Sequence, residues 1–204
     1  MTGTLICWDG RRVVLPDLTS WRMEYACGIP CDSFYLECLW EPGEAGALAE
    51  AVRFAAEEDT ATILYFIKEL AAYENMLNEV VATEETLREW IFEQKKAEVL
   101  FVVTDGEEVG FALFFHNFST FLGRAGIYLE DLYVKPEYRG KGYGKGLLKE
   151  LARIAVRRGC GRLEWWCLDW NRPSIDFYRS LGAQPMEDWT VYRIAGETLR
   201  ELAQ

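Results

Sequence analysis

The spacing of hydrophobic and polar side chains changes after the first quarter of the chain. Before that point, residues 34–40 place an apolar side chain at every second position, which predicts a half-buried strand. Residues 8–11 carry a turn signal between two short apolar runs and predict a hairpin. Residues 42–46 combine proline and glycine as linkers do. We therefore expect residues 1–46 to form a β-rich N-terminal extension and residues 47–204 to form the main domain.

In the main domain, helical and strand patterns follow one another. A stripe from Ile63 to Ala71 at helical spacing predicts a helix that begins at Asp59 or Thr60. Thr83 is placed to cap a second helix. Further helices are predicted over residues 144–157 and 173–181, and strands over residues 52–54, 99–103, 109–115, 127–134, 162–168 and 191–194. This order predicts a mixed α/β fold with about six to seven strands and helices on both faces of the sheet.

The charge distribution narrows the classes of partner. The chain of 204 residues has a formal net charge of −11, and the acidic surplus lies entirely in residues 1–100. Such a charge makes nucleic acid a poor partner. The acidic surplus either keeps the surface soluble or attracts a cationic substrate. No apolar run is long enough to span a membrane, and the N-terminus lacks a secretory pattern, so we expect a cytoplasmic protein.

Cysteine and histidine usage argues against metal chemistry. The six cysteines show no paired C-x2-C spacing, and His116 is the single histidine. We therefore expect no metal site, and no catalysis by a Ser-His-Asp triad unless His116 supplies its imidazole.

Chemistry is concentrated in residues 130–148, where a strand pattern runs through a glycine-rich basic turn into an amphipathic helix. Glycines let main-chain N–H groups approach a ligand closely, and a helix N-terminus adds positive potential, so the turn suits a pyrophosphate. Neither the dinucleotide pattern G-x-G-x-x-G nor the P-loop pattern fits these residues. The pattern that fits is R-x-x-G-x-G, as Arg139, Gly142 and Gly144.

With this turn, the chain resembles the GNAT acetyltransferases, in which the same pattern holds the pyrophosphate of acetyl-CoA. Residues 168–183 resemble a second family segment, N-x-x-[SA]-x-x-F-Y-x-x-x-G-[AF]. Together with residues 52–55, the likeness covers about residues 50–204, and within the family it is greatest to the diamine (spermidine/spermine) and thialysine N-acetyltransferases. The resemblance implies acetyl-CoA as cosubstrate, direct attack by the amine in a ternary complex, and a homodimer.

The resemblance also implies roles for individual residues. Tyr178 matches the general acid and Glu130 the group that polarises or deprotonates the amine, directly or through water. The cofactor-binding positions are Leu132, Tyr133, Val134, Arg139, Gly140, Lys141, Gly142, Tyr143, Gly144, Lys145, Asn171 and Ser174. The substrate-binding positions are Tyr73, Glu74, Glu130, Glu164, Trp165 and Trp166.

The chemistry of acetyl transfer to an amine requires the same kinds of group, a proton acceptor and a proton donor. A primary amine has a pKa of about 10 by analogy with lysine and must lose a proton before it attacks a thioester. The departing thiolate needs a proton, which a nearby tyrosine can supply. Packing is the competing interpretation for Tyr178, Trp165 and Trp166, which also suit an apolar core. Because Glu130 and Asp131 alternate along a strand, we expect at least one of them to face solvent or a structural partner.

Two features keep other functions open. Polyamine-specific relatives carry an acid followed by tryptophan in the loop before the fourth strand, whereas residues 116–124 have neither. A short diamine, thialysine or another small primary amine is therefore favoured over a long polycation, and a protein or peptide amine is the rival substrate. The first 41 residues faintly resemble the start of phage baseplate hub proteins, so a structural or interaction protein with a CoA-binding domain is the rival from another class.

Overall fold

The computed structural model describes residues 3–6, 12–15 and 51–204. The chain divides into two compact units, Met1–Glu50 and Ala51–Gln204. In the first, β1 (Gly3–Ile6) and β2 (Arg12–Leu15) pair antiparallel, which confirms the predicted hairpin. The strand predicted over residues 34–40, the linker at residues 42–46 and most of the segment with the phage resemblance lie outside the described residues.

The second unit is built on a mixed sheet whose strands follow the order β3-β4-β5-β6-β7. Neighbouring strands are antiparallel except for β6 and β7, which run parallel. The strands are β3 (Ala51–Phe54), β4 (Glu98–Thr104), β5 (Glu107–Ser119), β6 (Arg124–Val134) and β7 (Leu163–Trp165). This order places the predicted cofactor strand, β6, next to the last strand of the sheet.

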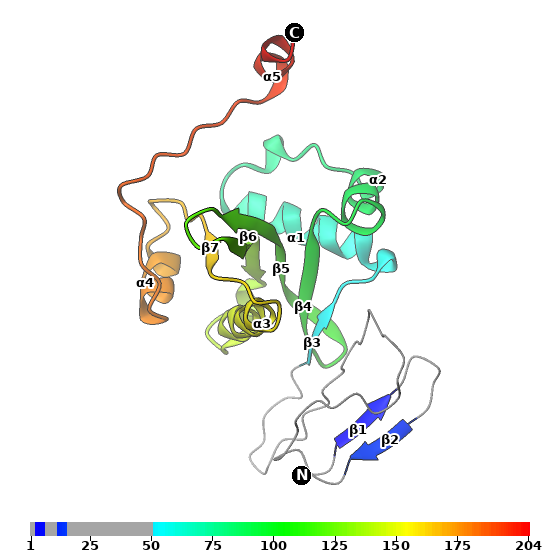
Figure 1. Cartoon of the computed structure of the whole chain (residues 1–204). Coiled ribbons are helices and arrows are strands. Elements are labelled where there is room, and N and C mark those ends of the chain that lie inside the picture. The colour runs from blue at the N-terminus through cyan, green and yellow to red at the C-terminus, as the bar shows by residue number, and fades with distance from the viewer. Residues whose placement is uncertain (1–2, 7–11, 16–50) are drawn as a thin grey trace, which may run out of the picture. The chain divides into compact units, whose positions relative to one another are not determined.

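Helices cover both faces of this sheet (Figure 1). The helices are α1 (Thr60–Tyr73), α2 (Glu84–Leu87), α3 (Tyr143–Arg157), α4 (Arg172–Ser180) and α5 (Gly196–Leu202), with a π-helical turn at Arg88–Glu93 and 3-10 turns at Glu57–Asp59, Leu77–Glu79 and Pro136–Tyr138. Thr83 accepts a hydrogen bond from the Thr86 N–H, so it caps α2 as predicted. The mixed α/β architecture predicted from the sequence is therefore confirmed.

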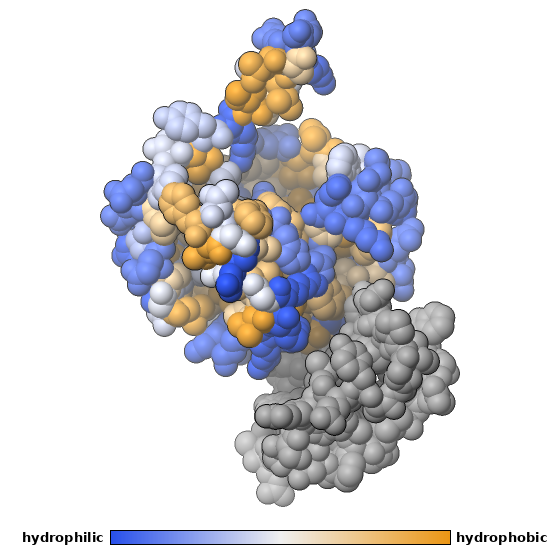
Figure 2. Space-filling model, in the orientation of Figure 1, coloured by the Kyte–Doolittle hydropathy of each residue, from blue (hydrophilic) through white to orange (hydrophobic). Residues whose placement is uncertain are grey.

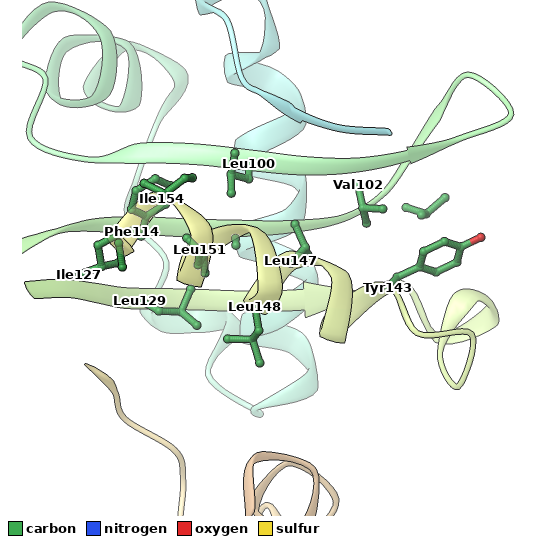
Figure 3. Close-up of a cluster of buried hydrophobic side chains, with 13 residues drawn as sticks. Leu100, Val102, Phe114, Ile127, Leu129, Tyr143, Leu147, Leu148, Leu151 and Ile154 are labelled. Atoms are coloured by element: carbon green, nitrogen blue, oxygen red, sulfur yellow. The ribbon is translucent and has the colours of Figure 1, made fainter. Parts of the chain in front are cut away.

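Two hydrophobic clusters hold the helices against the sheet. On one face, Leu147, Leu151 and Ile154 of α3 are buried against Leu100 and Ile127 of the strands, as Figure 3 shows. On the other face, Ile63 and Phe66 of α1 pack with strand residues that include Phe101, Phe111 and Tyr133. Truncating one of these fully buried leucines to alanine costs about 2–5 kcal/mol in comparable cores. The two faces thus give a rigid frame for the groups between β6 and β7.

Two predicted strands differ from the structure. β7 spans three residues instead of the seven predicted over residues 162–168, and its pairing with β6 ends at Trp165. Residues 191–194 form no strand, and in the described chain they pair with none of the strands. The sheet therefore has five strands instead of six or seven. No helix among the described residues is long and apolar enough to cross a membrane.

Candidate active site

The glycine-rich turn between β6 and α3 leaves open space above its main chain. Gly140 and Gly142 have φ angles of +74° and +96°, a conformation that side chains rarely adopt. A Cβ atom added at either residue would meet nothing within 4 Å. Gly142 is the N-cap of α3, and no side chain caps the first-turn N–H groups. The turn thus offers free N–H groups and the positive end of a fifteen-residue helix, as an anion site requires.

Beside this turn, β6 and β7 separate. Their pairing covers Ile127 to Leu129 of β6, so residues 130–134 have no strand on the β7 side. Lys135 donates its N–H to Val109 of β5, whereas the Val134 carbonyl faces the other way and accepts a bond from Arg139 Nε at 2.9 Å. Because main-chain groups alternate along an antiparallel pair, Leu132 also directs its N–H and C=O away from β5. The gap therefore exposes the main-chain groups that an extended ligand needs.

A β-bulge at Glu130 decides which way the acidic side chains point. Along β6, Leu129 pairs with Phe114 and Asp131 pairs with Leu113, so Glu130 is the extra residue. Leu129 packs on the α3 side of the sheet, whereas Leu113, the partner of Asp131, packs on the α1 side. Asp131 consequently faces the α1 side. Simple alternation from Leu129 would have turned it into the core beneath α3.

Two other carboxylates, those of Glu74 and Glu130, act on Asp131. Glu74 is the C-cap of α1. The pKa of Asp131 is raised from 3.8 to about 7. Burial is the main cause of this shift, and the two neighbouring charges contribute less. Burial likewise raises the pKa of Glu74. The predicted residues Glu74 and Glu130 thus both act on Asp131, a residue that sequence reasoning does not assign to the site.

A hydrogen-bond chain ties α1 to α4 across the gap. The Tyr73 hydroxyl donates to Asn171 Oδ1 at 3.1 Å, and the same oxygen accepts the Ser174 N–H at 3.3 Å. Asn171 is buried and caps α4 with this contact. The Arg139 guanidinium lies 4.9 Å from the centre of the Tyr73 ring and 5.2 Å from that of Tyr133. Predicted substrate and cofactor positions from four segments therefore form one network.

Tyr178 enters the same region from the α3 side. Its ring packs against Trp165 with centroids 4.9 Å apart, and it belongs to the core cluster under α3. Burial, followed by the nearby Cys167, Glu74 and Tyr73, raises the pKa of Tyr178 far above its usual value. Its hydroxyl therefore keeps its proton throughout the physiological range, as a proton donor must. Tyr178 and Trp165 also stabilise the core, so the packing interpretation of both residues holds alongside any role in the site.

Two predicted substrate positions have structural partners. Glu164 forms an ion pair with Arg162 at 2.6 Å and accepts a hydrogen bond from Asn117 Nδ2 at 2.6 Å. Its charge is therefore largely balanced within the chain. Trp166 is 56% exposed and stands edge-on to Tyr128, with ring centroids 5.7 Å apart. Lys141 and Lys145 are exposed at the glycine-rich turn, while Tyr143 is buried in the core.

A hollow among the described residues lies away from the glycine-rich turn. It measures about 350 Å³ and is lined by residues that include Tyr65, Glu107 and Lys135, none of which is a predicted site residue. The glycine-rich turn and the β6–β7 gap are distinguished instead by their free main-chain groups and by the charges beside them.

A turn with free main-chain N–H groups beside a strand gap and acidic side chains suits an enzyme that binds a phosphate-bearing carrier next to a cationic group. Comparison with known proteins agrees. The acetyltransferase (GNAT) family model matches residues 63–183. The chain belongs to this family, so it is an N-acetyltransferase, and acetyl-CoA is the family's cosubstrate.

Individual relatives refine the comparison. The chain is 42% identical over 164 residues to thialysine N-epsilon-acetyltransferase of Bos taurus, covering 74% of this chain and 96% of that protein. It is 44% identical over 93 residues to an L-ornithine N5-acetyltransferase of Arabidopsis thaliana. That match covers 46% of this chain and 41% of the Arabidopsis protein. Among solved structures, an integron cassette protein from V. cholerae aligns with a TM-score of 0.66 and 28% identity, over 78% of this chain and 99% of that one.

Proposed function

We propose that this N-acetyltransferase transfers the acetyl group of acetyl-CoA to a small primary amine with a second polar or charged group, of the thialysine, ornithine or diamine class. The observation that carries the proposal is the group of three carboxylates, Glu74, Glu130 and Asp131, beside the β6–β7 gap. An ammonium ion is the natural guest of such a group. The thialysine and ornithine acetyltransferases to which the chain is similar support the same class of substrate.

The pyrophosphate of acetyl-CoA fits the glycine-rich turn. Gly140 and Gly142 leave space for it, and the first-turn N–H groups of α3 have no side-chain cap to compete. Arg139, Lys141 and Lys145 add positive charge there. Main-chain groups of Leu132 and Val134 are placed to bind the pantetheine arm in the gap, and Asn171 and Ser174 border its far side. Acetyl-CoA supplies the activated acyl group.

Residues on either side of the gap are proposed to carry the two proton transfers, from the amine and to the leaving thiolate. With a pKa of about 7, Asp131 is half ionised at neutral pH and is placed to take the proton of the amine, together with Glu130. The Leu132 N–H faces the gap, where it is placed to stabilise the oxyanion of the tetrahedral intermediate. Tyr178 stays protonated and donates to the leaving thiolate, and Tyr73 and Glu74 border the amine. We further propose that the enzyme is a cytoplasmic homodimer.

A thiol-release assay with acetyl-CoA tests this function. The panel contains thialysine, ornithine, 1,4-diaminobutane, butylamine and a peptide with a free N-terminus. Butylamine is the matched control for the diamine, because it has the same length and lacks the second charge that the carboxylates would bind. We expect kcat/KM for thialysine, ornithine or the diamine to exceed that for butylamine by at least about tenfold, one such contact being worth roughly 1.4 kcal/mol. Acetylation of the peptide alone would overturn the proposal and assign a protein substrate.

A further inference from the structure

The bulge in β6 places an aromatic residue next to Asp131 on the same face of the sheet. Asp131 pairs with Leu113 of β5, which packs on the α1 side. Tyr128 pairs with Phe115, two positions farther along β5. The side chains of Tyr128 and Asp131 therefore share the α1 face, with main chains about 7 Å apart at roughly 3.3 Å per residue. The Tyr128 ring contacts those of Phe115 and Trp166, with centroids 5.1 Å and 5.7 Å away. We call Phe115, Tyr128 and Trp166 the aromatic shelf.

Charges of both signs act on this aromatic shelf. Burial raises the pKa of Tyr128, and the nearby carboxylates of Glu130 and Glu164 raise it further. The positive charge of Arg193 acts in the opposite direction. The Arg193 guanidinium lies 5.8 Å from the centre of the Trp166 ring, within the range of a cation–π contact. The aromatic shelf is therefore bordered by acidic side chains and by a guanidinium.

The charge of Arg193 is not balanced by an ion pair with any carboxylate among the described residues. By contrast, Arg162 is paired with Glu164 at 2.6 Å. Arg193 belongs to the C-terminal segment 183–204, in which every residue from position 184 onward is exposed. Figure 2 shows hydrophobic and hydrophilic residues of α5, at the end of this segment, open to solvent. An exposed guanidinium of this kind suits a carboxylate, which it can bind through two parallel N–H groups.

The spacing of these groups matches an amino acid that carries an amine on its side chain. When that amine lies at Asp131, extended ornithine or thialysine places its α-carboxylate five or six bonds away, about 6–7 Å at roughly 1.2 Å per bond. This length is close to the offset of about 7 Å between Asp131 and Tyr128 along β6. The α-carboxylate therefore lies over the aromatic shelf, on which Arg193 is the cation without a carboxylate partner in the described chain. A diamine of the same length would present a second ammonium to Arg193, which repels it.

We propose that Arg193 is a specificity-determining residue that binds the α-carboxylate of an amino-acid substrate, whose carbon chain lies on the aromatic shelf. This assignment rests on the proposed function and narrows its substrate class to α-amino acids with a side-chain amine. The amine that accepts the acetyl group stays at Asp131 and Glu130, so Arg193 takes no part in the proton transfers. Arg193 attracts the carboxylate and repels a second ammonium, so one residue acts on both members of the comparison.

Steady-state kinetics of the full chain with two matched substrate pairs tests the role of Arg193. 1,4-Diaminobutane is ornithine without its carboxylate, and bis(2-aminoethyl) sulfide is thialysine without its carboxylate. We expect the wild type to favour the amino acid of at least one pair by about tenfold or more in kcat/KM. Arg193→Gln should lower kcat/KM for that amino acid by about tenfold or more, and should leave the value for its diamine unchanged or higher. Arg200→Gln is the control, because Arg200 is exposed in the same segment and pairs with Glu197 at 2.9 Å. It should leave both values unchanged.

The comparison within each pair separates binding of the carboxylate from a structural role. A structural role of Arg193 would lower kcat/KM for an amino acid and its diamine by the same factor, and that result would overturn the assignment. A wild type that does not favour the amino acid of either pair, or a preference that persists in Arg193→Gln, would overturn it as well. Thiol release with neither pair refutes the proposed acetylation of small amines. Release with the amino acids and diamines alike, unchanged by Arg193→Gln, refutes the role of Arg193 alone.

Discussion

Asp131 provides the sharpest test of the site, because its environment predicts opposite effects of one substitution on stability and on activity. The pKa of this half-buried carboxyl is raised from 3.8 to about 7, first by burial and then by the charges of Glu130 and Glu74. The folded state therefore keeps a proton that the unfolded chain releases between about pH 4 and pH 7. Wild-type stability must fall as the pH rises through this window, and the loss persists above it.

The magnitude follows from the shift. A difference of about three pKa units corresponds to about 4 kcal/mol at 1.36 kcal/mol per unit, which is an upper limit for the stability lost above pH 7. An asparagine side chain has nearly the same shape as the native aspartate and cannot ionise. Asp131→Asn should therefore raise the free energy of unfolding by up to about 4 kcal/mol at pH 8.5, and by no more than about 1 kcal/mol at pH 4.5.

Urea unfolding at the two pH values, followed by tryptophan fluorescence, measures the effect. Asp105→Asn is the matched control: Asp105 is an exposed turn residue with φ of +52°, which asparagine adopts equally well. The same Asp131→Asn protein should lose roughly 10²–10⁴ of kcat, the usual contribution of a general base. A stability gain that is equal at pH 4.5 and pH 8.5 would refute the titration argument, and an unchanged kcat would remove Asp131 from the mechanism.

Three further substitutions test the other parts of the site. Gly142→Ala, which forces a side chain into a φ of +96°, should weaken CoA binding in calorimetry at least tenfold, whereas Gly146→Ala inside α3 should leave it unchanged. Tyr178→Phe should lower kcat by roughly 10²–10⁴-fold with little effect on KM for acetyl-CoA. The control Tyr192→Phe, at an exposed tyrosine, should leave kcat unchanged. Equal kcat values for the wild type and Tyr178→Phe would exclude Tyr178 as the proton donor. Arg139→Lys loses the hydrogen bond to Val134 and the planar contacts with Tyr73 and Tyr133, so KM for acetyl-CoA should rise several-fold; an unchanged KM would show that Arg139 does not hold the cosubstrate.

The sequence predicts the elements whose signals are local. The helix over residues 144–157 is found because Leu147, Leu151 and Ile154 repeat at helical spacing, and the same residues are buried in the structure. The open glycine turn is likewise predicted, since glycine at positive φ is a property of a few adjacent residues. The helix and the glycine turn are both determined by residues close together in the sequence, so a local pattern is enough to predict them.

Features that depend on a second strand escape sequence reasoning. Residues 191–194 have strand composition, but whether they pair depends on a second strand, and in the described sheet they pair with none. Asp131 is missed for the same reason, because alternation along β6 gives no sign of the bulge that turns it to the α1 side. The break in hydrophobic register, with Leu129 followed by Leu132 and Val134, is the signal that would have revealed it.

In the proposed mechanism, that bulge links cofactor binding to amine activation. Without the extra residue, Asp131 would share the face of Leu129 and enter the core under α3, where an unpaired carboxylate costs several kcal/mol. Leu132 and Val134 would then exchange faces as well, so the core packing and the main-chain groups at the gap would change together. Because Asp131 and Leu132 are adjacent, the group that we propose takes the amine proton and the N–H that faces the gap are set by one local distortion of β6. Variants that lengthen or shorten β6 at Glu130 should therefore impair acetyl-CoA binding and amine activation jointly, whereas substitutions at Glu74 should affect the amine alone.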